Sequence, residues 1–163
     1  MLQTLDTQTL WQALDEVKDP EIPVVSVVEM GIVRAVETCD EKVTVTMTPT
    51  FSGCPALQVM KDDIEAKLLS LGVAEVEVKT VLSPAWSTDW LSDGAKEKLE
   101  AYGITPPEPT NDDGLIQLEP APRRCPRCGS LDTTTQNSFG PTLCKSIHTC
   151  NRCREPFEAF KSL

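Results

Sequence analysis

Four cysteines in two close pairs are the residues of this sequence whose type and spacing most clearly support chemistry. The pairs are CPRC (125–128) and CNRC (150–153), and 21 residues separate them. A C-x-x-C turn can direct both sulfurs at one ion, and Gly129 permits the turn after the first pair. The pattern predicts a zinc ribbon in which the metal is structural, and its ligands are Cys125, Cys128, Cys150 and Cys153. Iron in a rubredoxin-like site is the alternative, because it takes the same tetrahedral sulfur ligands.

A further cysteine, Cys54, stands in TPTFSGCPA (48–56), where a strand pattern gives way to a helical one. Pro55 suits the first helical position, which would make Cys54 the N-cap residue, near the positive end of the helix dipole. That setting favours a metal-binding or reactive thiolate. Asp19 and Glu21 offer carboxylates that could approach it across the end of the sheet. The alternatives are a small packed residue at Cys54 and a helix stop with solvated acids at DPE.

Cys144 and His148 lie between the two cysteine pairs and are additional candidate ligands. A lone histidine is more often a packing or surface residue, whereas Cys144 is either buried or an additional thiol near the metal. Trp86 and Trp90 fit either a core or a protein interface. We expect the chain not to be catalytic itself, because it has no nucleotide-binding glycine loop and its one histidine gives Cys54 no base.

Helix and strand patterns alternate ahead of the first cysteine pair. Apolar spacing predicts helices near 7–18, after Cys54 up to Gly72, and over 93–102, and it predicts strands near 31–37, 43–48 and 73–81. The sequence CDEK supplies a turn between the first two strands. The predicted fold class is α+β, a small mixed sheet with helices packed on one face, followed by a zinc-ribbon β-hairpin.

Composition divides the chain into three predicted parts. Residues 1–104 form the α+β domain, with 18 acids and 8 bases. Residues 105–122 contain five prolines and four acids and are predicted to be a stiff, extended linker. Residues 123–163 form the ribbon, with 3 acids and 7 bases. A net charge of -10 argues against a nucleic-acid partner for the whole chain, and the lack of a signal peptide or long apolar run predicts a cytoplasmic protein.

Several separate motifs resemble known families. The segments DPEIPVVSVVEMGIV, TPTFSGCP and SPAWSTDWLSDGAKEKLEAYGITPP are similar to the iron-sulfur cluster assembly accessory domain of the SUF-associated type, over residues 9–107. With CPRCGS, FG-x-T-x-CK and CREPFEAFK added, nearly the whole chain resembles the D-subunit family of bacterial phenylacetyl-CoA epoxidase. Pro141 stands where that family more usually has serine.

The resemblance implies a role in phenylacetate catabolism, a pathway of aromatic compound degradation. Its implied partners are a di-iron oxygenase component and a reductase with flavin and a [2Fe-2S] cluster. Cys54 would handle iron or an iron-sulfur cluster beside Asp19 and Glu21, and Cys144 would have a role within FG-x-T-x-CK. Our hypothesis is an accessory protein that assists iron or iron-sulfur maturation of the epoxidase, in contact with assembly machinery.

Two other hypotheses remain open. One is a structural or adaptor subunit of the epoxidase without metal transfer, motivated by the tryptophan loop. The other is a nucleic-acid-binding ribbon, motivated by the basic residues of the C-terminal part. A homodimer is also open, because one Cys54 per chain would let two chains share a cluster.

Overall fold

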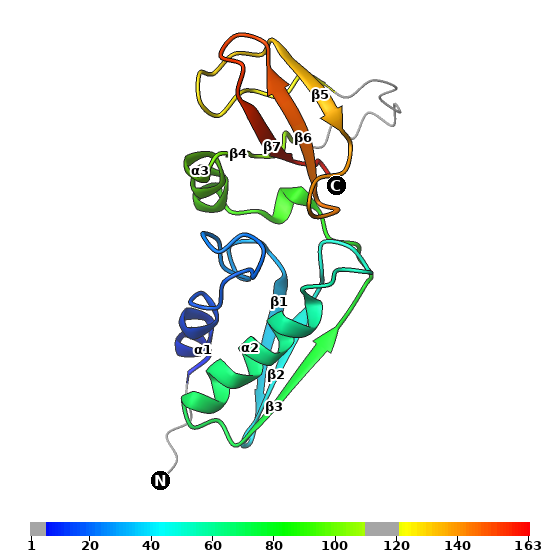
Figure 1. Ribbon diagram of the computed structural model, residues 1–163. Helices are drawn as coiled ribbons and strands as arrows, with labels where there is room; N and C mark the ends of the chain where they lie inside the picture. Colours follow the sequence, from blue (N-terminus) through cyan, green and yellow to red (C-terminus); the bar gives the residue numbers. More distant parts are fainter. Residues whose placement is uncertain (1–5, 110–120) are drawn as a thin grey trace. The chain divides into compact units, whose positions relative to one another are not determined.

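The computed structural model describes residues 6–109 and 121–163, which belong to two compact units (Figure 1). Unit 1 contains the chain up to Trp86 together with Trp90–Ala95, and unit 2 contains Ser87–Asp89 and Lys96–Leu163. Within the described residues, no helix combines the length and apolar character needed to cross a membrane.

Unit 1 is built on a three-stranded mixed sheet. Its strands are β1 (Val33–Cys39), β2 (Lys42–Met47) and β3 (Glu75–Thr80), in the order β1-β2-β3. β1 and β2 are antiparallel across the predicted CDEK turn, whereas β2 and β3 are parallel. The sheet therefore confirms the predicted mixed topology, with strand ends within two residues of expectation.

Two helices cover one face of this sheet, α1 (Thr7–Leu14) and α2 (Leu57–Ser70) (Figure 1). The alternating strand residues and the helical apolar residues meet in the core, where the buried side chains include Leu10, Leu14, Val43, Val45, Met47, Met60, Ile64 and Leu68. Gly72 ends α2 with a φ of 90°, as its position predicted. The α+β fold class of the sequence analysis is confirmed.

α1 ends four residues earlier than predicted. The N–H of Val27 donates to the carbonyl of Val17 at 2.9 Å, and an isolated bridge joins Lys18 to Ser26. These tertiary hydrogen bonds hold residues 15–18 outside the helix, although the helical apolar spacing of the sequence continues through them. Val17 nevertheless remains buried, although it lies beyond the end of the helix.

Unit 2 contains a four-stranded sheet in the order β4-β7-β6-β5. The strands β5 (Thr133–Asn137), β6 (Lys145–Cys150) and β7 (Pro156–Phe160) are antiparallel, and β4 (Ile104–Thr105) pairs in parallel with β7. The predicted hairpin is present as β5 and β6, but the sheet has two more strands than a hairpin provides.

α3 (Asp93–Tyr102) has the predicted bounds and ends at Gly103, whose φ is 94°. It follows the short 3-10 helix η1 (Thr88–Trp90). Most of α3 groups with unit 2, as does β4 after it, whereas the predicted domain boundary at residue 104 stays a prediction.

The extended linker over 105–122 stays a prediction, and the structure describes only the two ends of that segment. The Thr105 hydroxyl donates to the carbonyl of Arg124 at 2.6 Å, and the Arg123 guanidinium donates to the carbonyls of Pro106 and Phe160. These hydrogen bonds hold the two ends of the segment close together in unit 2. Its middle, 110–120, lies outside the described residues.

Candidate metal centre and thiol sites

The four ribbon cysteines meet at one point of unit 2. Their sulfur atoms all lie within 4.8 Å of one another. The Sγ atoms of Cys125 and Cys153 are 3.7 Å apart, and those of Cys128 and Cys150 are 3.5 Å apart. A tetrahedral ion with metal–sulfur bonds of about 2.3 Å requires sulfur separations of about 3.8 Å. The arrangement therefore fits a tetrahedral metal ion with four sulfur ligands.

The two C-x-x-C turns have the same backbone structure. The N–H of Gly129 donates to the carbonyl of Cys125, and the N–H of Arg154 donates equivalently to that of Cys150. Gly129 and Arg154 each follow the second cysteine of a pair, and both have positive φ, 70° and 64°. Sequence analysis identified this requirement only at Gly129, because arginine gives no signal of a left-handed conformation.

The metal centre occupies the place of a hydrophobic core. Cys125 and Cys150 are buried together with Phe157 and Ala159, and the two remaining cysteines pack against this cluster. The Cys153 N–H hydrogen-bonded to Cys150 lowers the pKa of that thiol to about 7. Burial and the neighbouring thiols raise the pKa of Cys153 to about 12, so in the absence of metal the four thiols do not all ionise together. A bound cation would favour the thiolate form of all four.

The other two candidates in the ribbon are not part of this sulfur group. His148 is buried and stacked on Phe157, and its ring nitrogens contact the hydroxyls of Thr135 and Ser146. Burial, together with the charge of Arg123, lowers the pKa of His148. His148 is therefore the packing residue that the simpler interpretation expected.

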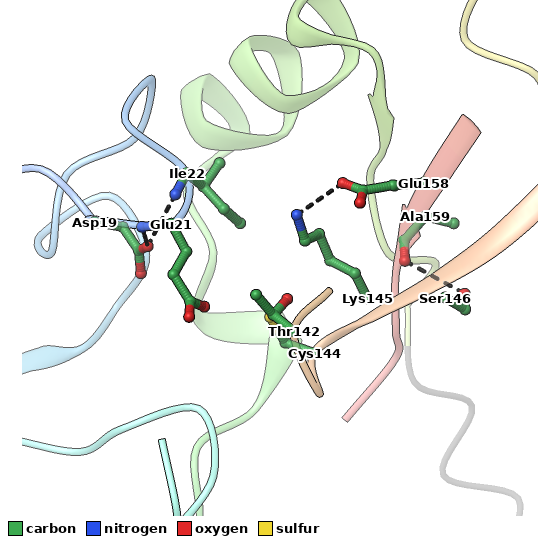
Figure 2. A network of polar contacts seen from close by, with 9 residues as sticks. All are labelled: Asp19, Glu21, Ile22, Thr142, Cys144, Lys145, Ser146, Glu158 and Ala159. Atoms are coloured by element: carbon green, nitrogen blue, oxygen red, sulfur yellow. Dashed lines mark hydrogen bonds and ion pairs between the residues drawn. The ribbon is translucent and has the colours of Figure 1, made fainter. Parts of the chain in front are cut away.

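Cys144 is buried immediately before β6, and its sulfur lies 3.1 Å from the hydroxyl of Thr142. Burial lowers the pKa of Lys161, and the Cys144 thiol acts in the opposite direction. The adjacent Lys145 forms a 2.7 Å ion pair with Glu158 (Figure 2). Burial of Cys144 agrees with one of the two interpretations of the sequence, and its role as an additional functional thiol remains a prediction.

In unit 1, the DPE sequence forms a tight turn. One oxygen of the buried Asp19 carboxylate accepts hydrogen bonds from the N–H groups of Glu21 and Ile22, at 2.8 and 3.0 Å (Figure 2). The turn is closed by the N–H of Asp19, which donates to the carbonyl of Val25. Asp19 thus has a structural task of its own, because aspartate stabilises turns by binding backbone N–H groups two or three residues ahead.

Cys54 lies in the loop between β2 and α2 and is partly exposed. The prediction that it is the N-cap of α2 is wrong, because the helix begins at Leu57 and Ala56 is its N-cap. The Cys54 carbonyl instead accepts from the N–H of Leu57 at 3.2 Å, in a turn ahead of the helix. No side chain caps α2, since alanine has no hydrogen-bonding group.

Hydrogen bonds place the DPE segment and the loop of Cys54 at the same end of the sheet. The segment after DPE lies beside the start of β1, because the N–H groups of Ile32 and Val33 donate to the carbonyl of Val27. Thr48, which begins the Cys54 loop, donates to the carbonyl of Ile32 at 2.8 Å. Among the described residues, however, only the four ribbon sulfurs form a metal-ligand group of three or more, so Asp19, Glu21 and Cys54 do not make a complete site.

The tryptophan loop packs within unit 1. Trp86 is 5% exposed and donates its indole N–H to the carbonyl of Met30 at 2.9 Å. The Arg34 guanidinium lies 3.6 Å from the centre of the Trp90 ring. Of the two interpretations of these tryptophans, packing is the one that the structure supports.

Residues 111–161 match the PaaD zinc beta ribbon domain, and residues 7–81 match the iron-sulfur cluster assembly protein family. The chain is 40% identical over 154 residues to an Escherichia coli (strain K12) protein that is provisionally named as the D subunit of 1,2-phenylacetyl-CoA epoxidase. The match covers 94% of this chain and 92% of that protein. The chain belongs to the PaaD family.

The N-terminal half of this PaaD-family chain also has shorter relatives. It is 39% identical over 88 residues to a Porphyromonas gingivalis (strain ATCC BAA-308 / W83) protein named Fe-S protein maturation auxiliary factor, covering 53% of this chain and 83% of that one. A Bacillus anthracis crystal structure of the DUF59 domain matches with a TM-score of 0.54 at 34% identity, over 56% of this chain and 89% of that one. Both resemblances inferred from the motifs are confirmed.

Proposed function

We propose that this PaaD-family chain is an accessory protein that assists iron or iron-sulfur maturation of a multicomponent phenylacetyl-CoA epoxidase. The recipients are the metal-bearing oxygenase and reductase components. The proposal is supported by two different similarities, to an epoxidase D subunit over most of the chain and to an Fe-S maturation auxiliary factor over the N-terminal half.

The observation that carries this proposal is the position of Cys54, whose thiol is partly exposed in the loop between β2 and α2. One thiolate can hold iron or a cluster only while other ligands come from a recipient, a second copy or solvent. Such a site favours transfer over storage, because the recipient can replace weak ligands one at a time.

The acidic turn has two different tasks in this proposal. Asp19 acts through the backbone, because its carboxylate holds the turn closed. Glu21 supplies the carboxylate that can assist Cys54 when iron binds. A mixed set of oxygen and sulfur ligands suits iron that is being transferred, because it lacks the four sulfur ligands that hold a stable cluster.

The ribbon metal is Zn²⁺ in this proposal, and its task is structural. Four thiolates fill a tetrahedral site completely, so no position is open for substrate. The basic residues of residues 123–163 offset the two negative charges left on such a centre. That balance supports a folded docking module for protein partners more than a nucleic-acid-binding surface.

An adaptor subunit without metal transfer is the second candidate. The tryptophans no longer favour it, but two apolar side chains of the ribbon do, since Phe139 is 58% exposed and Leu143 is 52% exposed. They flank the turn before β6, and the Lys161 ammonium lies 4.1 Å from the Phe139 ring centre. An apolar pair beside a cation is a plausible contact for a protein partner.

Replacing Cys54 with serine distinguishes the two candidates in cells. We expect Cys54→Ser to lower the iron content and the activity of the epoxidase at least several-fold, because serine oxygen binds iron less well at this site. The matched control is Cys39→Ser, since Cys39 is an exposed thiol at the other end of the sheet. Wild-type iron content and activity with Cys54→Ser would remove the transfer role and favour the adaptor.

A further inference from the structure

Thr80, the last residue of β3, has a buried hydroxyl oxygen without a hydrogen-bond partner. It is the one buried side-chain nitrogen or oxygen in this condition among the residues that the structure describes. Buried hydroxyls are nearly always hydrogen-bonded, because leaving one unpaired in the protein interior destabilises the fold. An orphaned hydroxyl therefore suggests a group that binds there in the working protein.

The register of the sheet shows which way Thr80 points. It lies opposite Met47 in the parallel pairing of β2 and β3, as Val78 lies opposite Val45. Directly paired residues of neighbouring strands project to the same face, and Met47 and Val45 are buried on the face that α2 covers. Thr80 therefore points towards the layer of α2.

The connection between the strands places Thr80 at the end of the sheet where the Cys54 loop begins. β2, α2 and β3 form a β-α-β unit, so α2 begins at the carboxyl ends of both strands. Figure 1 shows the arrowhead of β3 at the end of the sheet from which the loop before α2 departs. The carboxyl edge of parallel strands is where α/β folds usually bind ligands.

Two further features of this edge fit a bound anionic group. The amino end of α2 has no side-chain cap and no acidic residue in its first turn. Its leading N–H groups and its dipole therefore favour negative charge next to Cys54. Thr80, at the end of β3, adds an uncharged hydrogen-bond donor at the same edge of the sheet.

We propose that the Thr80 hydroxyl is a positioning residue that donates a hydrogen bond to the metal-bound sulfur at this edge, either the Cys54 thiolate or an inorganic sulfide. The inference rests on the proposed function, because it takes Cys54 as the thiolate that holds iron. Hydrogen bonds to iron-bound sulfur strengthen the hold on the metal and tune its electronic properties. In this proposal the Thr80 hydroxyl has a hydrogen-bond partner only when iron or a cluster is bound.

The test compares Thr80→Val, Thr80→Ser and Cys54→Ser in the full-length protein with its ribbon metal in place. Each variant is exposed anaerobically to ferrous iron and sulfide, and iron retention is measured by competition with a chelator and by sulfur-to-iron charge-transfer absorption. We expect Thr80→Val to retain iron about tenfold less tightly, as loss of one hydrogen bond to a charged group predicts. Thr80→Ser should restore retention.

Urea unfolding of the iron-free protein supplies the second readout. Valine fills nearly the same volume as threonine and removes the unpaired hydroxyl, so Thr80→Val should unfold at an equal or higher urea concentration than wild type. The iron-free protein thus gains stability from the change that weakens iron retention. A merely structural threonine would instead lose stability and leave iron retention unchanged.

The outcomes separate this inference from the function on which it rests. If Cys54→Ser loses iron while Thr80→Val retains it like wild type, the Thr80 role is wrong and the transfer role stands. If Cys54→Ser retains iron like wild type, both are wrong. If Thr80→Ser retains iron no better than Thr80→Val, the hydroxyl is not the donor.

Discussion

Replacing Cys128 with serine should release the ribbon metal and abolish the protection of β5, β6 and β7 from hydrogen exchange. The four cysteines make up most of one buried cluster, whose other buried members are Phe157 and Ala159. Metal binding contributes about 10 kcal/mol or more to the folding of comparable four-ligand modules. The other buried apolar residues of unit 2, such as Phe160 and Ile104, are too few to replace that contribution, so we expect the ribbon sheet to unfold at room temperature.

Metal content by elemental analysis and hydrogen exchange of residues 133–160 measure this effect. Cys39→Ser is the matched control, because it also removes one thiol but lies outside unit 2. A Cys128→Ser protein that keeps native exchange protection without metal would show that the cysteines are packing residues. Stoichiometric iron in place of zinc in the wild type would revise the metal but not its structural task.

Replacing Gly31 with alanine should destabilise unit 1 by about 3–5 kcal/mol, the second large effect. Gly31 has a φ of 67°, and a Cβ built on it would lie 2.7 Å from both the Cβ and the carbonyl oxygen of Trp90. Backbone atoms cannot move aside as a flexible side chain does. The Trp86 and Trp90 contacts to residues 30–34 should therefore be disrupted together.

Gly72→Ala is the matched control, because Gly72 also has a positive φ, 90°, but nothing lies within 4 Å of the added Cβ. It should cost only about 1 kcal/mol from backbone strain. The three tryptophans, Trp11, Trp86 and Trp90, all belong to unit 1, so their fluorescence during urea unfolding reports on this unit. Equal losses for the two alanine variants would show that the Trp90 contact does not constrain Gly31.

Local signals explain the parts of the fold and site that sequence alone could predict. The C-x-x-C spacing identified all four sulfurs that converge, and apolar periodicity predicted the helix α2 that ends before Gly72. Each of these features depends on residues within a few positions of one another, where turn geometry and helical spacing act directly.

Long-range contacts explain what sequence reasoning missed. A two-residue strand such as β4 has no periodicity to detect, and its pairing with β7 joins residues more than 50 positions apart. The hydrogen bond from Thr105 to Arg124 likewise closes a segment that its prolines suggested was extended. Composition describes how stiff a segment is but not whether tertiary bonds bring its ends together.

The site in unit 1 shows the same limit. Pro55 suggested a helix start at Cys54, but Ala56 is the N-cap, and alanine at a cap carries no sequence signal. Thr80 gave no signal either, because a threonine at the end of a strand is ordinary. Only its burial without a partner distinguishes it.

The central claim is that this chain supplies metal to its partners rather than holding them together. Iron and acid-labile sulfide should be measured in the oxygenase and reductase components isolated from cells that produce them with and without this protein. We expect the partners to be under-metallated in its absence, with activity reduced in proportion to the missing metal. Fully metallated partners with low activity would contradict the claim and identify an adaptor instead.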